Sequence, residues 1–342
     1  MPDEMRRKLV GLWLGCRRFH RITAKEYGVP LASMSDINGL LACPVCGARL
    51  LPAAKGYRCD ATAAAPHTFP LLGGVPVLVD FDTSVLDRTQ LLRSNASSLV
   101  PRRIERWPWV KRALEWFSAA GNDSTAGRTL ERILGWTPRP TILVVGGGTA
   151  GPGARLLYER PDVRVIAFDV YHSPLTQFVA DAHAIPLQNA TVDAVWVQAV
   201  LEHVLEPQRV VDEIRRVLRP EGFLLSEIPF MQQVHEAAFD FTRFTDLGQR
   251  WLFRRFEEVE SGVVAGPGIG LAWSLDYFVR GLTRSRLLGR LVGFGFCWLG
   301  WLERLIPVPF ARDAASCLYF VGRRSERVLT PREVVRGYRG AQ

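Results

Sequence analysis

From about residue 139 onward, short apolar runs alternate with longer segments whose apolar positions recur at helical spacing. The apolar runs at 141–145, 163–168, 194–198 and 223–227 predict buried strands, and the segment 207–218 predicts a helix. Strands and helices that alternate in this way indicate an α/β fold with a parallel, doubly wound sheet. Ligands bind to such sheets beyond the carboxyl ends of the strands, so the site is expected there.

The rest of the chain divides into regions of different composition. We predict a basic helical extension over residues 1–39, a compact module rich in Cys, Gly and Pro over 40–80, a helical linker over 81–138, the α/β domain over 139–325 and a basic tail over 326–342. Residues 264–310 are aromatic and basic, which predicts a hydrophobic helical insertion before the last strand. The apolar run at 291–302 is too short to cross a bilayer.

The composition is that of a folded protein that favours anionic partners. Hydrophobic residues make up 48% of the 342 residues and charged residues 23%, which excludes a disordered or fibrous chain. The net charge of +9 favours phosphate, nucleic acid or anionic lipid, but does not choose among them. The aromatic helices of 264–310 could lie on a membrane surface or cap a lipid-like acceptor. The alternative is that they pack on the sheet.

The cysteines indicate a reducing compartment. Six cysteines are too few for a disulfide scaffold, and three of them lie close together near the amino terminus. Arg17, Arg18 and Arg21 follow the first apolar run, where a signal peptide would have small residues. We therefore expect a cytoplasmic protein, with a peripheral position at the inner face of the membrane as the alternative.

A glycine-rich turn and an acidic residue mark a nucleotide site. Gly146, Gly148 and Gly151 follow the first strand of the α/β domain, where glycines let the backbone turn tightly and approach a ligand. Asp169 ends the next strand, where a carboxylate can accept hydrogen bonds from both hydroxyls of a ribose. A dinucleotide oxidoreductase would share both features, but the residues that follow argue against one.

The chain resembles class I S-adenosylmethionine-dependent methyltransferases of the small-molecule type. The resemblance rests on residues 180–204, ADAHAIPLQNATVDAVWVQAVLEHV, and on the turn Arg219-Pro-Glu-Gly222 before the fifth strand. It covers about residues 139–260, and continues more loosely to about 325. The resemblance implies a Rossmann-like, seven-stranded doubly wound sheet and S-adenosylmethionine as the cofactor.

The resemblance also implies roles for individual residues. Gly146, Gly148 and Gly151 would line the methionine part of the cofactor, and Asp169 would hold its ribose. Asp181, with Ala182 beside it, would bind the adenine, and Gln198 would lie beside the sulfonium. The chain departs from the family at Val144, where an acidic residue is usual, and this departure leaves a non-catalytic descendant as an alternative.

Four residues after the fourth and fifth strands are candidates for chemistry on the acceptor. His203 could remove the proton of a hydroxyl or amine, or it could be a structural histidine at a helix start. His235, Asp240 and Arg243 resemble a His, Asp, aromatic, Arg-Phe-Thr sequence of one methyltransferase subgroup. A His–Asp pair can orient a base, and Arg243 could clamp a phosphate or carboxylate. The alternative is a salt bridge between Asp240 and Arg243 that fixes a helix start.

The module at 40–80 resembles the small zinc ribbons related to tRNA-methyltransferase activator subunits. It contains the C-x2-C pair Cys43 and Cys46, followed by Cys59. Thr62 stands where the ribbon would have its fourth cysteine, so His67 is the expected substitute in a Cys3His zinc site. The alternatives are a metal-free hydrophobic ribbon and a redox-active C-x-x-C pair.

These features predict an S-adenosylmethionine-dependent methyltransferase that acts on a small-molecule, glycan or lipid-linked acceptor, with methylation on oxygen favoured. One alternative is an RNA or protein methyltransferase in which the ribbon and basic helices dock a macromolecule. Residues 198–201 read Gln-Ala-Val-Leu instead of an Asn-Pro-Pro-Tyr type of motif, which disfavours nucleic acid. A second alternative is a non-catalytic cofactor-binding regulator. The sequence does not predict the oligomeric state.

Overall fold

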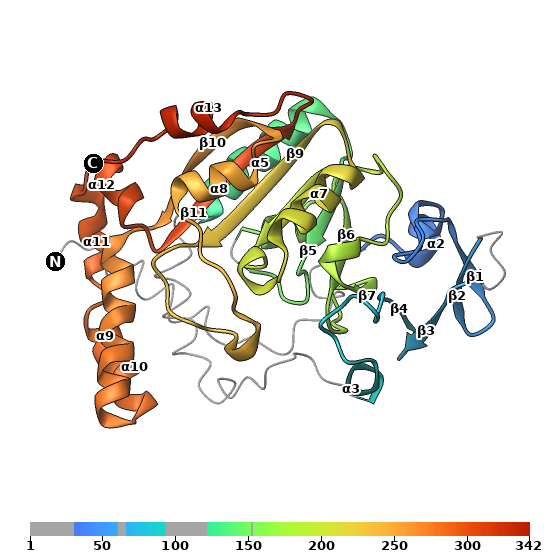
Figure 1. The fold of residues 1–342 in the computed structure, drawn as a ribbon, viewed down its shortest axis with the longest axis horizontal. Helices are drawn as coiled ribbons and strands as arrows, with labels where there is room; N and C mark the ends of the chain where they lie inside the picture. Colours follow the sequence, from blue (N-terminus) through green and yellow to red (C-terminus); the bar gives the residue numbers. More distant parts are fainter. Residues whose placement is uncertain (1–30, 61–65, 94–121, 152) are drawn as a thin grey trace, which may run out of the picture.

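The computed structural model describes residues 31–60, 66–93, 122–151 and 153–342, and a single mixed sheet runs through them (Figure 1). Its strand order is β1-β2-β3-β4-β7-β6-β5-β8-β9-β11-β10. The strands are β1 (Leu50–Ala53), β2 (Gly56–Cys59), β3 (Thr68–Leu72), β4 (Val75–Leu78), β5 (Thr141–Val145), β6 (Arg164–Asp169), β7 (Phe178–Ala180), β8 (Val192–Gln198), β9 (Leu218–Pro229), β10 (Phe256–Ala265) and β11 (Cys317–Arg324).

The strands β5 to β11 form the α/β part of the sheet. Neighbouring strands from β7 through β9 are parallel, and β11 and β10 complete the sheet in antiparallel orientation. The whole sheet has eleven strands rather than the seven expected, because the amino-terminal module adds its four strands to one edge. β4 pairs in parallel with β7, through Val77 with Val179 and Leu78 with Ala180. The module is therefore joined to the main sheet and does not stand apart from it.

Helices cover both faces of the sheet, as the alternating apolar pattern requires. On one face, α5 (Asn122–Trp136) and α6 (Arg155–Tyr158) pack against alternate residues such as Ile142 and Val144. On the other face, α7 (Pro207–Val217) and α8 (Asp246–Leu252) pack against Leu143 and Val145. Figure 1 shows α7 and α8 in front of the sheet and α5 behind it. Each strand of this central part is consequently buried on both sides.

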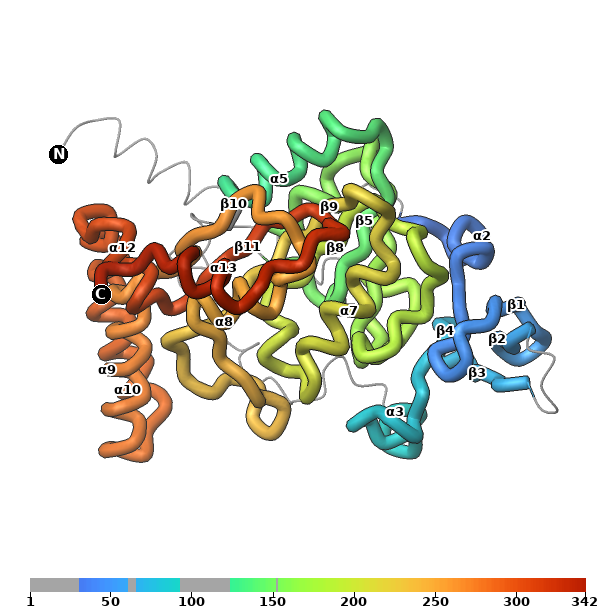
Figure 2. The backbone as a smooth tube through the Cα atoms, turned by 45° about the horizontal axis from the view of Figure 1, so that its top comes forward, coloured from blue at the N-terminus to red at the C-terminus, as the bar shows by residue number. Residues whose placement is uncertain are grey.

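Four short helices and one longer one lie between β10 and β11. They are α9 (Pro267–Thr283), α10 (Arg286–Gly295), α11 (Leu299–Leu302), η7 (Glu303–Leu305) and α12 (Val308–Asp313). Glu303 accepts the backbone N–H groups of Gly266 and Ile269 and so fixes the start of α9. Figures 1 and 2 show α9 and α10 side by side, at the opposite end of the molecule from the amino-terminal module. None of the helices in the described ranges is long and apolar enough to cross a membrane.

The amino-terminal module shares its core with the α/β domain. It begins with α2 (Met34–Ile37) and η2 (Asn38–Leu40), and Leu41 forms a β-bridge with Leu187. Its buried side chains, including Cys43 and Phe69, belong to the same apolar cluster as Phe168 of β6. Much of the predicted extension over 1–39 and of the predicted linker over 81–138 lies outside the described residues. The described part of the linker region holds α3 (Arg88–Arg93) and most of α5; the tail at 326–342 holds α13 (Pro331–Arg336).

Candidate active site and metal clusters

A cavity of about 520 Å³ lies where the carboxyl ends of β5 to β9 meet. Its size is within the usual range for a pocket that holds a cofactor and a small substrate. The wall contains eight of the residues predicted to bind the cofactor or the acceptor, which are Gly146, Gly151, Asp169, Asp181, Ala182, Gln198, His203 and His235. Gly148, Asp240 and Arg243 are not among the described residues that line it. The fold therefore brings most of the predicted site into one cavity.

The turn after β5 has glycines at positions where a side chain would collide with neighbouring atoms. Gly146 has φ +72°, and a Cβ there would lie 2.4 Å from Cγ2 of Val200. Gly148 lies behind the cavity wall, where its N–H donates to Oδ2 of Asp169 at 2.8 Å. A Cβ on Gly148 would come within 2.6 Å of that same oxygen. Gly148 thus contributes by positioning Asp169, and not by lining the cavity as expected.

Asp169 and Asp181 are held by backbone and side-chain donors. Oδ1 of Asp169 accepts the N–H of Val170 at 2.7 Å, and its side chain is almost completely buried. Asp181 accepts from the backbone N–H and Nδ1 of His183 at 3.0 and 2.6 Å, and also from the hydroxyl of Ser84. Burial opposes ionisation of Asp181, but the hydrogen bonds from His183 and Ser84 outweigh it and lower its pKa. Both carboxylates are therefore held in place, and the lowered pKa of Asp181 favours its charged form.

The middle of the cavity is formed by the end of β8 and the helical turn η4 (Ala182–Ala184). Oε1 of Gln198 accepts the indole N–H of Trp196 at 3.0 Å, which sets the orientation of the amide. Gln198 lines the cavity at the end of the strand. Val144, which replaces the acidic residue usual in the resembled family, also lines the wall.

A buried carboxylate lies between two imidazoles at the other end of the cavity. Glu202 and His203 belong to the turn η5 (Leu201–His203), and His235 comes from the loop after β9. Nε2 of His203 and Nε2 of His235 lie 3.6 and 3.7 Å from Oε1 of Glu202. Glu202 is 0% exposed, and among the described residues neither of its carboxylate oxygens has a hydrogen-bond partner. Such a group is costly to bury without compensation.

The loop after β9 is organised around Asp240. Its carboxylate accepts the backbone N–H of His235 at 2.9 Å and lies 3.3 Å from Nδ1 of the same residue. Burial lowers the pKa of His235, but the carboxylates of Glu202 and Asp240 raise it by more, so the net shift is upward. Burial also opposes ionisation of Asp240, yet the hydrogen bonds from Arg243 and His235 hold its pKa at about 2. Asp240 therefore orients His235 from behind the cavity wall.

Arg243 is committed to this loop and is not placed to clamp a substrate. It pairs with both oxygens of Asp240, with one nitrogen at 2.7 Å. Its remaining N–H groups donate to the backbone carbonyls of Gln232, Gln233 and Thr242 at 2.8–3.1 Å. A guanidinium has five N–H donors, and all five are used here. The predicted substrate clamp is therefore not the arrangement observed; the alternative, a salt bridge that fixes the loop, is.

The four predicted metal ligands of the amino-terminal module lie together. One ligand atom each of Cys43, Cys46, Cys59 and His67 is found within 4.8 Å of all the others. Nδ1 of His67 lies 3.6 Å from the Sγ atoms of both Cys43 and Cys59. A sulfur and a nitrogen bound to one tetrahedral zinc ion are about 3.5 Å apart. Burial raises the pKa of the Cys43 thiol to about 12, so this cysteine needs a cation to become a thiolate. The geometry fits a Cys3His site.

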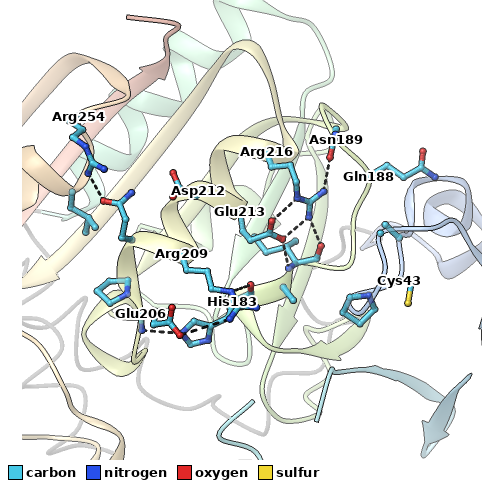
Figure 3. A pocket seen from close by; sticks show the side chains of 18 of the residues that line it. Cys43, His183, Gln188, Asn189, Glu206, Arg209, Asp212, Glu213, Arg216 and Arg254 are labelled. Atoms are coloured by element: carbon cyan, nitrogen blue, oxygen red, sulfur yellow. Dashed lines mark hydrogen bonds and ion pairs between the residues drawn. The ribbon is translucent and has the colours of Figure 1, made fainter. Parts of the chain in front are cut away.

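A second hollow of about 1380 Å³ lies outside the cavity, between the Cys43 turn, α7 and α8 (Figure 3). Its charged side chains bind one another. Arg216 donates to Glu213, Asn189 and the carbonyls of Ile185 and Leu187, and Arg254 donates to Gln208. Because these donors are already used, the hollow is best explained as a polar crevice in which α7 is tied to residues 185–189.

Comparison with known proteins agrees with the geometry of the cavity. Residues 143–226 match the sequence model of the family described as "Methyltransferase domain". This part of the chain is therefore similar to methyltransferase domains. The match covers β5 to most of β9, and thus the glycine turn, both fixed carboxylates and Glu202 and His203.

Several relatives share parts of this methyltransferase domain. An uncharacterised 37.1 kDa protein encoded in a transposon of Streptomyces fradiae is 39% identical over 51 residues, which are 15% of each chain. An uncharacterised methyltransferase of Mycobacterium tuberculosis is 38% identical over 91 residues, 24% of this chain and 37% of the relative. The chain thus spans well under half of the length of these curated relatives. Among solved structures, the 1,6-didemethyltoxoflavin-N1-methyltransferase of Burkholderia thailandensis is 15% identical with a TM-score of 0.38, over 67% of this chain and 93% of that one.

The wall of the cavity also contains site residues that sequence reasoning missed. Glu202 stands beside the predicted His203, but its burial between two imidazoles depends on the loop after β9. Glu227 ends β9 and lines the cavity, and the rule that ligands bind at strand ends could have identified it. Burial first, and then the carboxylates of Glu227 and Glu202, raise the pKa of the Cys317 thiol. Ile269 and Trp273 of α9 close the wall, and no local motif signals their position.

Proposed function

We propose that the protein is an S-adenosylmethionine-dependent methyltransferase that methylates an oxygen of a small-molecule, glycan or lipid-linked acceptor. The observation that carries the proposal is the single cavity that unites Asp169 and Asp181 with His203 and His235. When bound, the cofactor supplies an electrophilic methyl group on a cationic sulfur. The protein's task is then to align an acceptor oxygen with that methyl group and to receive the acceptor's proton.

The cofactor end of the cavity suits a nucleoside with a flexible tail. Each oxygen of Asp169 accepts one backbone N–H, from Gly148 or Val170, and we propose that the carboxylate also accepts the ribose hydroxyls. Asp181 and Ala182 are proposed to bind the adenine, and Gly146 and Gly151 make room for the methionine part. Gln198 is proposed to lie beside the sulfonium. These assignments use the donors and acceptors that the fold already fixes in place.

The acceptor end offers two imidazoles for the proton. Nδ1 of His203 lies 2.7 Å from the carbonyl oxygen of Phe239, which can only accept, so this nitrogen carries the hydrogen. Nε2 is then the basic nitrogen, and the same argument holds for His235. We propose that one of these Nε2 atoms receives the hydroxyl proton. The acceptor oxygen would then be free to take the methyl group that the bound cofactor supplies.

We propose that the acceptor reaches the cavity from a membrane surface. The α9–α10 pair exposes large apolar side chains such as Phe278, Leu282 and Leu287, each more than 60% exposed. Arg284 and Arg286 flank the turn between the two helices, so the apolar tip is rimmed by positive charge. Apolar tips of this kind enter the boundary of anionic bilayers. Because Trp273 lies on the same α9 and lines the cavity, a lipid-linked acceptor could pass from one to the other.

We also propose that the amino-terminal module holds one zinc ion through Cys43, Cys46, Cys59 and His67. The ion would be structural, because four protein ligands complete a tetrahedral site. The module shares its core with the methyltransferase domain, and β4 extends the sheet next to β7. The zinc is therefore expected to stabilise this edge of the domain and to take no part in transfer.

The proposed function is tested by an assay of methyl transfer to the unidentified acceptors in a cell extract. The full chain is incubated with S-adenosylmethionine labelled in the methyl group and with bacterial extract separated into aqueous and organic phases. We expect label in an organic-soluble product, and none with Asp169→Ala. Asp212→Ala, an exposed carboxylate in an ion pair with Arg255, is the matched control and should transfer normally. Label only in protein or RNA would support the alternative acceptors, and no label in any fraction would contradict the proposal.

A further inference from the structure

We propose that Glu202, His203 and His235 bind one divalent transition-metal ion at the acceptor end of the cavity. The proposed site is distinct from the zinc cluster of the amino-terminal module. For the place of the acceptor it rests on the proposed function, but binding of the ion does not depend on methyl transfer. The argument begins with the unpaired charge of Glu202.

Glu202 carries a charge that the protein itself does not satisfy. It is completely buried, and within the described part of the chain neither carboxylate oxygen receives a hydrogen bond. Nε2 of His203 and Nε2 of His235 lie 3.6 and 3.7 Å from its Oε1. These distances are too long for hydrogen bonds. A buried carboxylate without partners is strongly destabilising, so a native structure usually pairs it with a cation.

The imidazoles of His203 and His235 have the orientation that is common for histidines that bind a metal ion. The carbonyl oxygen of Phe239 holds the Nδ1–H of His203 at 2.7 Å, and the carbonyl of Gln233 and the carboxylate of Asp240 hold the Nδ1–H of His235 at 3.3 Å. In both rings the Nε2 lone pair therefore points to the carboxylate of Glu202. Two lone pairs aimed at an anion repel it, whereas a cation between the three groups attracts them all. Ligating histidines commonly have this second partner on the other nitrogen.

The distances match those of ligands around one ion. Ligands bonded at about 2.0–2.2 Å to a common metal, with angles of about 109–120°, lie about 3.3–3.8 Å apart. The observed 3.6 and 3.7 Å fall in this range, and the three ligand atoms all lie within 4.8 Å of one another. The backbone N–H groups of Phe241 and Thr242 donate to the carbonyl of Glu202, which ties η5 to the loop that carries His235. The site is thus built before the ion arrives.

The donor set indicates the class of ion and its role. Two imidazoles and a carboxylate suit Mn²⁺, Fe²⁺, Co²⁺ or Zn²⁺ and leave coordination positions open. The open positions face the cavity, where an acceptor oxygen could complete the coordination. A bound cation lowers the pKa of a hydroxyl group that coordinates it. With the ion in place, His203 and His235 would act as ligands and not as bases, so the proton of a coordinated acceptor hydroxyl would pass to solvent water instead of to an imidazole.

The test uses Mn²⁺ alone as the probe, because thiolates of the amino-terminal cluster favour softer ions. The full chain is freed of metal and titrated with Mn²⁺ while the free ion is measured by electron paramagnetic resonance. We expect one tightly bound Mn²⁺ per chain, which Zn²⁺ displaces. Glu202→Gln keeps the shape and should weaken binding by more than about 100-fold. Asp240→Asn weakens the pairing with Arg243 and the support of His235, and should weaken binding by about tenfold. His172→Gln removes a histidine outside the site and should change nothing.

Two results would overturn the inference. One is a wild-type protein that leaves Mn²⁺ free at every concentration, and the other is Glu202→Gln binding as tightly as the wild type. Binding of S-adenosylhomocysteine is measured in parallel and should be retained by each variant, which shows that the variant is folded. If the wild type binds Mn²⁺ but not S-adenosylhomocysteine, the proposed function fails and the metal site stands. If it binds S-adenosylhomocysteine but no Mn²⁺, only the metal site fails.

Discussion

Two clusters of metal-binding side chains differ in how the chain assembles them. Cys43, Cys46, Cys59 and His67 lie within 25 consecutive residues, and a hairpin brings them together. Glu202 and His203 meet His235 only because β9 crosses the sheet and its loop returns over η5. Sequence spacing reveals the first cluster and cannot reveal the second. A site formed by residues close in sequence can be predicted from their spacing. A site formed at the ends of several strands can be predicted only when the order of the strands in the sheet is known.

The two clusters also differ in chemistry. Thiolates and one imidazole close a tetrahedron around zinc, which leaves no position for a substrate. Two imidazoles and a carboxylate would leave positions open, and Glu202, His203 and His235 all line the cavity. We therefore expect a structural role for the first cluster and a role in handling the acceptor for the second. The predictions below test this contrast.

The largest effect is expected from removing a ligand of the structural cluster. Cys59→Ser should reduce zinc from one ion per chain to almost none and expose the module to proteolysis, since binding of structural zinc contributes on the order of 10 kcal/mol to folding. Zinc is measured by elemental analysis after purification without chelator. Cys297→Ser, outside the cluster, should keep its zinc. Full zinc retention in His67→Ala would show that His67 is not the fourth ligand.

The second-largest effect is expected on the rate of methyl transfer. It tests the role of the cluster formed by Glu202, His203 and His235. His235→Gln should lower the rate of methyl transfer by about 100- to 10,000-fold, because a base or a metal ligand is lost at the acceptor. Affinity for S-adenosylhomocysteine should not change. His172→Gln serves as the control. Near-normal turnover in His235→Gln would leave His203 as the better candidate for the proton.

A smaller effect is expected from the residue that supports this cluster. Arg243→Ala should lower the transfer rate by about tenfold and the free energy of unfolding by about 2–3 kcal/mol, because it removes the hydrogen bonds that Arg243 donates to Asp240 and to three backbone carbonyls. The Michaelis constant for an anionic acceptor should stay the same, since Arg243 is turned into the loop. Arg255→Ala, which loses one exposed ion pair, is the control. A large rise in the Michaelis constant alone would restore Arg243 as a substrate clamp.

The smallest effect is expected on the free energy of unfolding. It is tested by replacing a carboxylate that has hydrogen-bond partners and one that has none. Glu260 accepts from Arg132 at 2.6 Å and Tyr319 at 2.9 Å, and also from Arg128. Burial opposes its ionisation, but these hydrogen bonds hold its pKa at about 2, below the value in the unfolded chain. Its contribution to stability is therefore present above about pH 4.5 and is lost as the pH falls toward 2.

Thermal unfolding in the presence of chelator measures this difference. At pH 7, Glu260→Gln should lower the free energy of unfolding by about 1 kcal/mol, and the difference from wild type should shrink below about pH 4.5. Glu202→Gln should cost nothing or should stabilise the metal-free protein, because it removes a buried charge without partners. If Glu202→Gln is the more destabilising of the two, the carboxylate has a protein partner and the contrast is wrong.

The sequence was informative wherever short-range pattern decides the structure. The alternating apolar runs predicted β5, β6, β8 and β9, and the glycine turn and acidic strand end located most of the cofactor side of the cavity. The sequence did not predict the features that depend on contacts between residues far apart in the chain. The pairing of β4 with β7 made the sheet longer than predicted, and no local pattern encodes it. Gly148 and Arg243 carry the expected residue types but face other protein groups instead of the cavity.

The central claim is that the cavity binds the cofactor of methyl transfer through Asp169. Calorimetric titration of the full chain with S-adenosylhomocysteine tests it most directly, since it requires neither an acceptor nor a metal. We predict one site per chain in the wild type and an affinity at least about 100-fold lower in Asp169→Ala, which loses two hydrogen bonds to a charged group. Absence of binding by the wild type, or equal affinity in Asp169→Ala, would contradict the account.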